Sequence, residues 1–118
     1  NKSAYCVAHN TNTLMTDDSG EGEGWNFSAE DVAKLFDPAY APDDPAEKAA
    51  IEYGKAASFD HSNVPQSVLD DLAATMTPPQ IVELACVVGF WAMYNSIHEA
   101  LHIPIEEALQ GNAAFLDA

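Results

Sequence analysis

Apolar residues recur along this chain mainly at helical spacing, and no stretch shows the strict alternation that is typical of a half-buried strand. Residues 2–14 have the pattern of the end of a helix, which carries Cys6. A short helix is predicted to begin after Ser28, a capping residue, and to stop at Asp37-Pro38. Between these two helices, residues 16–24 form a loop rich in glycine and acid. The pattern predicts an all-α protein.

Three further helices have recognisable starts. Asp44-Pro45-Ala46-Glu47 combines a capping acid, a proline at the first helical position and a glutamate at the third, and the helix that follows is predicted to reach about Ala57. Another helix is predicted to begin near Pro65. Thr77-Pro78-Pro79-Gln80 begins the longest helix, predicted over residues 78–102, and residues 105–109 form a last turn or two.

The longest predicted helix is apolar nearly all round between Ile81 and Ile97. Such a helix is normally covered on every side, so we expect a buried central helix, enclosed by its own domain and by a subunit partner. Cys86 lies within it and is expected to be a small, inert core residue. A membrane span is the alternative, but four polar residues interrupt an already short segment. They are Glu83, Asn95, Ser96 and His98.

Composition narrows the class of protein. With 118 residues and 47% apolar content, the chain is expected to form a single domain over residues 1–118. Four lysines, no arginine and a net charge of −15 disfavour nucleic acid and anionic membranes as partners. Two cysteines do not make a disulfide framework, which favours the cytoplasm. Because the chain does not begin with methionine, we expect an N-terminal part to be missing from it.

The candidate chemistry lies near the start of the chain. Cys6 and His9 are three residues apart on a predicted helix, so the imidazole can reach the sulfur directly or through a water. A thiol next to an imidazole ionises more readily and becomes a nucleophile, which a peroxide would convert to a sulfenic acid. Cys6 is the predicted nucleophile and His9 the predicted base, with no cofactor required.

A second motif suggests different chemistry. His98-Glu99-Ala100-Leu101-His102 satisfies the His-Glu-x-x-His pattern of zinc hydrolases, in which two imidazoles one turn apart share a metal. No further histidine follows His102, and His61, Glu106 or Glu107 would be a third ligand only if the fold brought one of them close. Our prediction is therefore that the protein binds no metal, with His98 and His102 as the alternative.

The first motif also resembles the active site of the alkylhydroperoxidase D-like (carboxymuconolactone decarboxylase) family. That site runs Cys-x-x-Cys-x-x-x-His, often with tyrosine before the second cysteine and an additional histidine before the last one. Tyr5, Cys6 and His9 match it, while Ser3 takes the place of the first cysteine and Asn10 that of the principal histidine. A second region is similar to the family's C-terminal helix. It comprises Thr77-Pro78-Pro79-Gln80-Ile81-Val82-Glu83-Leu84, Phe90-Trp91-Ala92-Met93-Tyr94-Asn95 and Leu101-His102-Ile103-Pro104.

The resemblance implies an all-α alkylhydroperoxidase-like domain that assembles into trimers or hexamers, and a thiol-dependent antioxidant or redox function that uses one motif cysteine. Ser3, Tyr5 and Asn10 would then line the substrate pocket. Because Ser3 cannot close the family's disulfide, an external thiol would act as reductant. The family's proton-relay glutamate would precede Asn1. Two alternatives stay open: a carboxymuconolactone decarboxylase-type lyase without thiol redox chemistry, and a non-catalytic oligomeric member.

Overall fold

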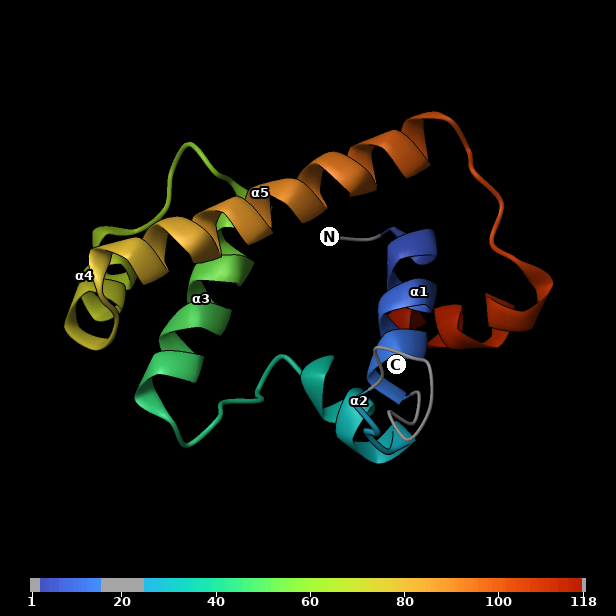
Figure 1. The fold of residues 1–118 in the computed structure, drawn as a ribbon, viewed down its shortest axis with the longest axis horizontal. Coiled ribbons are helices and arrows are strands. Elements are labelled where there is room, and N and C mark those ends of the chain that lie inside the picture. Colours follow the sequence, from blue (N-terminus) through green and yellow to red (C-terminus); the bar gives the residue numbers. More distant parts are fainter. Residues whose placement is uncertain (1–2, 16–24, 118) are drawn as a thin grey trace. The chain divides into compact units, whose positions relative to one another are not determined.

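The computed structural model describes residues 3–15 and 25–117, and within these ranges every regular element is a helix (Figure 1). The prediction of an all-α protein is confirmed. The elements are α1 (Ala4–Met15), α2 (Ala29–Leu35), α3 (Pro45–Phe59), α4 (Gln66–Thr75), α5 (Pro78–Ala100) and a final 3-10 segment η1 (Glu107–Asp117). The predicted glycine and acid loop at 16–24 lies outside the described residues.

The chain folds into two compact units, which we describe separately. The middle unit comprises residues 41–94, and the terminal unit comprises residues 2–40 together with 95–118. Helix α5 begins in the middle unit, and its last turns belong to the terminal unit. Whether residues 1–118 behave as a single domain in solution stays a prediction.

Local capping accounts for where α2 and α3 begin. The Ser28 hydroxyl accepts the backbone N–H of Asp31 at 3.1 Å, and the Asp31 carboxylate in turn accepts the N–H of Ser28 at 3.3 Å. At α3, the Asp44 carboxylate accepts the N–H of Glu47 at 2.9 Å, and Pro45 occupies the first turn, where its missing N–H costs nothing. Both starts are those that the sequence predicts.

Helix α5 begins after Thr77, as predicted, but ends two residues early, at Ala100. The N–H of Ile103 donates to the His98 carbonyl at 3.1 Å, and the N–H of His102 to the Glu99 carbonyl at 3.2 Å. These bonds close the helix in a Schellman-type turn, with His102 in the left-handed region at φ 49°. His102 therefore lies beyond the helix and does not share a helical face with His98, as the zinc motif requires.

The left-handed conformation of His102 in this turn leads to a prediction for the free energy of unfolding. A side chain in the left-handed region costs about 1–2 kcal/mol, from which the greater flexibility of an unfolded glycine subtracts part. We expect His102→Gly to raise the free energy of unfolding by about 0.5–1 kcal/mol in urea denaturation. His102→Ala keeps the Cβ atom and should give no gain. Equal gains from both variants would show that the imidazole, not the backbone, is the unfavourable group.

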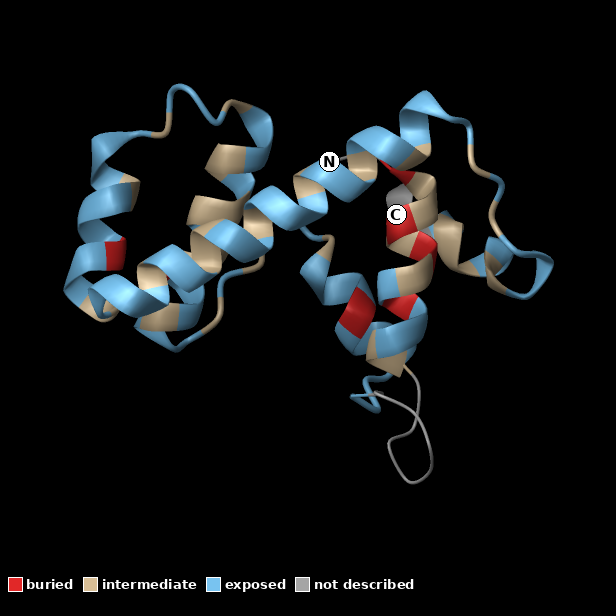
Figure 2. Ribbon diagram, turned by 45° about the horizontal axis from the view of Figure 1, so that its top comes forward, coloured by how far each residue is buried: buried red, intermediate tan, exposed pale blue. Residues whose placement is uncertain are grey.

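Each unit has a small core of its own (Figure 2). In the terminal unit, α1 packs against η1 and α2, and the buried residues are Ser3, Cys6, Ala8, Thr11 and Val32. In the middle unit, α3 packs against α4, and Ala49 and Leu72 are buried. The predicted nucleophile Cys6 is thus a core residue of the terminal unit, with 6% of its surface exposed.

The prediction that the domain itself buries α5 is wrong, whereas cover by a subunit partner stays a prediction. No residue of α5 is buried, and Cys86, expected in the core, is exposed. One side of α5 is half-buried, whereas apolar side chains on the other side are exposed, among them Val82, Val87, Phe90, Trp91 and Met93. By length and composition, α5 is also the one helix among the described residues that qualifies as a candidate membrane span, a test that core helices of soluble proteins pass too.

Candidate functional site

Helix α1 places Cys6 in its first turn. The Ser3 hydroxyl accepts the backbone N–H of Cys6 at 3.4 Å, which is the arrangement of an N-terminal cap. The prediction placed Cys6 near the end of a helix, whereas α1 begins at Ala4. Ser3 therefore supports the cysteine through the backbone rather than through its sulfur.

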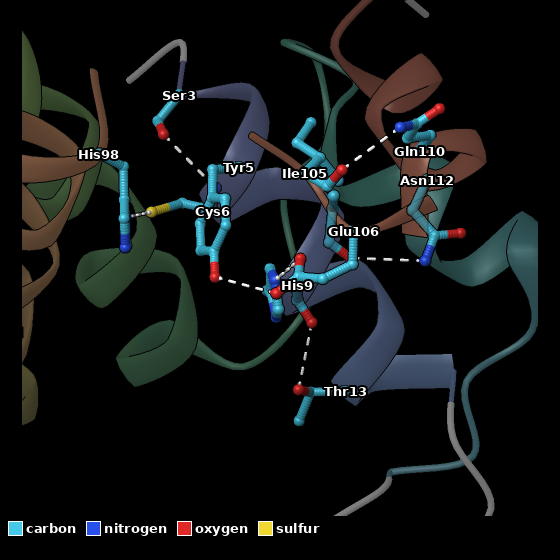
Figure 3. A network of polar contacts seen from close by, with 11 residues as sticks. Ser3, Tyr5, Cys6, His9, Thr13, His98, Ile105, Glu106, Gln110 and Asn112 are labelled. Carbon is cyan, nitrogen blue, oxygen red and sulfur yellow. Dashed lines mark hydrogen bonds and ion pairs between the residues drawn. The ribbon is translucent and has the colours of Figure 1, made fainter. Parts of the chain in front are cut away.

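The imidazole that reaches the Cys6 sulfur belongs to His98, at the other end of the chain. Cys6 Sγ and His98 Nδ1 are 3.4 Å apart, within hydrogen-bonding distance for sulfur (Figure 3). Both residues belong to the terminal unit. The sequence pointed to His98 only as an alternative metal ligand and gave the role of base to His9. The structure pairs Cys6 with His98 instead.

His9 is engaged elsewhere. Its Nε2 atom lies 2.7 Å from Oε2 of Glu106, and Oε1 of the same carboxylate accepts the Tyr5 hydroxyl at 3.3 Å (Figure 3). Glu106 lies between α5 and η1, so α1 is tied to the C-terminal segment by its polar side chains. Sequence reasoning considered Glu106 only as a distant zinc ligand, because nothing local connects it with residues near the start of the chain.

The ring of Tyr5 is in contact with the rings of both histidines, His9 and His98. Its centroid lies 4.4 Å from that of His9, with the planes at 27°, and 4.1 Å from that of His98, with the planes at 30°. Two nearly parallel rings at these distances cannot share one face of the tyrosine. Tyr5 is therefore sandwiched between His9, which is bound to the carboxylate, and His98, which faces the sulfur.

The electrostatics of this cluster are consistent with a negative carboxylate and a neutral phenol. The pKa of Glu106 is lowered by its own backbone N–H and then by the hydrogen bond from His9. The pKa of Tyr5 is raised by desolvation and by the nearby Glu106 charge. Glu106 consequently accepts hydrogen bonds as a carboxylate at neutral pH, and Tyr5 remains a hydrogen-bond donor.

The other predicted pocket residues are distributed unevenly. Ser3 is buried beside Cys6, whereas Asn10, which takes the place of the family's principal histidine, is exposed. The structure adds a residue that the sequence indicated only as part of a helix pattern. The Oδ1 atom of Asn95 is buried without a hydrogen-bond partner, and Asn95 lies one helical turn before His98.

Within the part of the chain that the structure describes, no three or more His, Cys, Asp or Glu side chains are grouped as a metal would require. His98 faces a thiol, and His102 lies past the helix end with its side chain exposed. A single cysteine and histidine pair provides too few ligands for a tetrahedral zinc site. The geometry thus favours proton transfer between Cys6 and His98 over metal ligation.

Comparison with known proteins adds no relative: no family model matches this chain, and neither a curated protein nor a solved structure does.

Proposed function

We propose that this protein is a thiol-dependent peroxidase of the alkylhydroperoxidase-like kind, with Cys6 as its single nucleophile and His98 as its base. The observation that carries the proposal is the 3.4 Å contact between Cys6 Sγ and His98 Nδ1. A sulfur positioned in the first turn of a helix and facing an imidazole has the two features that favour a thiolate. The resemblance of Tyr5-Cys6-x-x-His9 to the family motif supports the same chemistry.

The proposed reaction has three parts. His98 accepts the proton of the Cys6 thiol, and the thiolate attacks one oxygen of a hydroperoxide. The O–O bond breaks, Cys6 becomes a sulfenic acid, and the other oxygen leaves as water or an alcohol after taking a proton from His98. Because Ser3 provides no resolving sulfur, an external thiol then displaces the sulfenic oxygen as water and forms a mixed disulfide with Cys6. A second equivalent of that thiol restores the Cys6 thiol and leaves as the external disulfide.

Two features bear on the substrate. Cys6 is almost fully buried, which favours a small hydroperoxide over one with a bulky substituent. The unpaired Oδ1 of Asn95, one turn from the proposed base, is an acceptor for which a hydroperoxide O–H is a suitable donor.

The test of the proposal is sulfenic-acid trapping after one equivalent of hydrogen peroxide, with the two cysteine peptides quantified separately by mass spectrometry. We expect Cys6 to be labelled at least tenfold faster than Cys86. Exposure alone predicts the opposite order, because Cys86 is exposed and Cys6 is buried. If Cys6 is labelled no faster than Cys86, the peroxidase proposal is rejected. The lyase and the non-catalytic oligomeric protein then remain as alternatives.

We also propose that the partner covering α5 in the middle unit is a second copy of this chain. The aromatic side chains Phe90, Trp91 and Tyr94 are 49%, 40% and 37% exposed, which corresponds to roughly 250 Å² of surface per copy. With Val82, Val87 and Met93 the face reaches roughly 500 Å² per copy, near the lower bound for a specific interface of two copies.

Charge and backbone both favour this occupant over a lipid surface. The whole chain carries a net charge of −15, so it repels an anionic membrane. No charged residue lies between Glu83 and Glu99, so the same face of a second copy is not repelled. Gly89 lies within this helix at a cost of about 1 kcal/mol relative to alanine, and among the described residues a Cβ atom at this position would meet nothing within 4 Å beyond the helix's own backbone. That space allows a second helix to approach closely.

Light scattering at tens of micromolar protein tests this second proposal. We expect the wild-type chain to have the mass of a dimer or a larger oligomer and Phe90→Asp to be monomeric. Phe59→Asp introduces the same charge at a phenylalanine that is 94% exposed and outside this face, so it should keep the wild-type mass. A monomeric wild type, or co-flotation with neutral lipid vesicles, would overturn the assignment.

A further inference from the structure

We infer that Tyr5 is a positioning residue whose ring stabilises the protonated form of His98 and thereby increases the fraction of Cys6 present as thiolate. This inference rests on the proposed role of His98 as base. It assigns to Tyr5 a function that the family motif, in which Tyr5 only lines a pocket, does not state.

The argument begins with the proton transfer itself. When the Cys6 thiol gives its proton to Nδ1 of His98, a neutral pair becomes a thiolate and an imidazolium. Any group that favours the imidazolium shifts this equilibrium toward the reactive thiolate. The ring centroid of Tyr5 lies 4.1 Å from that of His98, well within the roughly 6 Å over which an aromatic face attracts a cation.

The surroundings of Tyr5 strengthen this effect. The Glu106 carboxylate accepts the phenol hydroxyl at 3.3 Å, which holds the ring in place and increases the electron density of its faces. On the opposite face lies His9, which would compete for the same ring if it carried an uncompensated positive charge. Its 2.7 Å contact with Glu106 offsets that charge. The arrangement thus leaves one face of Tyr5 for His98.

The titratable groups around the Cys6 and His98 pair include Tyr5 from α1, with His9 and Glu106 one ring farther away. The raised pKa of Tyr5 keeps the phenol neutral over the range in which a thiol titrates. A pH profile of Cys6 reactivity between pH 5 and 9 consequently reports on the thiol and imidazole pair.

The experiment measures alkylation of Cys6 by iodoacetamide across that pH range, with Cys86 as the internal control for reagent. Tyr5→Leu removes the ring, and we expect the rate at pH 7 to fall threefold to tenfold and the pH midpoint to move upward. Tyr5→Phe keeps the ring and loses the hydroxyl, so it should change the rate less than twofold. In a His98→Ala background, Tyr5→Leu should have no further effect.

Each result has a definite meaning. If both Tyr5 variants reduce the rate equally, the hydroxyl and Glu106 act rather than the ring, and the inference fails. If Tyr5→Leu is equally damaging without His98, the ring has a merely structural role, and the inference fails again. If Cys6 does not react with peroxide but the alkylation pattern holds, the inference stands while the peroxidase proposal is rejected.

Discussion

Replacing His98 with alanine is expected to slow the oxidation of Cys6 by hydrogen peroxide about a hundredfold, because a positioned general base contributes at least that much. The 3.4 Å contact between Sγ and Nδ1, through which the proposed base takes the thiol proton, would be lost. The measurement is the rate of sulfenic-acid trapping at pH 7, followed at Cys6 for both proteins.

Two histidine variants serve as matched controls. His9→Ala breaks the contact with Glu106 but leaves His98 in place, so we expect the rate to change less than threefold. His102→Ala alters an exposed residue beyond the helix end and should leave the rate unchanged. A large effect of His9→Ala with none from His98→Ala would reverse the assignment and restore the base that the sequence motif indicates.

Replacing Leu72 with alanine should lower the free energy of unfolding by about 3 kcal/mol, through the lost transfer free energy and the cavity left behind. Leu72 is 1% exposed and is the largest buried side chain where α3 packs on α4. Among the described residues of the middle unit only Ala49 is buried with it, so few other contacts compensate. Urea denaturation followed by circular dichroism, at one protein concentration, measures the effect.

Leu69 is the control on the same helix. It is 38% exposed, so Leu69→Ala removes less buried surface and should cost about 1 kcal/mol or less. Leu72→Met, which nearly conserves volume, should cost less than about 1.5 kcal/mol. Equal losses for Leu69→Ala and Leu72→Ala would show that Leu72 is not the packing centre between α3 and α4.

The starts of the helices were predictable because capping is local. Ser28 with Asp31, and Asp44 with Glu47, satisfy N–H groups three residues away, so the residue types at this spacing carry the information. The end of α5 was less predictable. The prediction continued the helix to His102, because a histidine in the left-handed region has no signal comparable to glycine.

Burial of α5 by its own domain is predicted from the apolar pattern and is wrong for a physical reason. An apolar helix face indicates that the face is unfavourable in water, but it does not indicate which other surface covers that face. The same ambiguity explains the prediction for Cys86. The pattern predicts a core residue, whereas the structure shows Cys86 exposed. An uncovered apolar helix is what the proposed self-association explains.

By itself, the sequence determined the helical class and the local starts of α2, α3 and α5, since each depends on neighbours within one or two turns. It also indicated Cys6 as the candidate nucleophile, which stays a prediction. Only the tertiary structure decided which imidazole lies within hydrogen-bonding distance of the Cys6 sulfur. Cys6 and His98 are 92 positions apart, and Glu106 is 97 positions from His9. Such pairs form only because α1 packs against the C-terminal segment, and no local spacing encodes that packing.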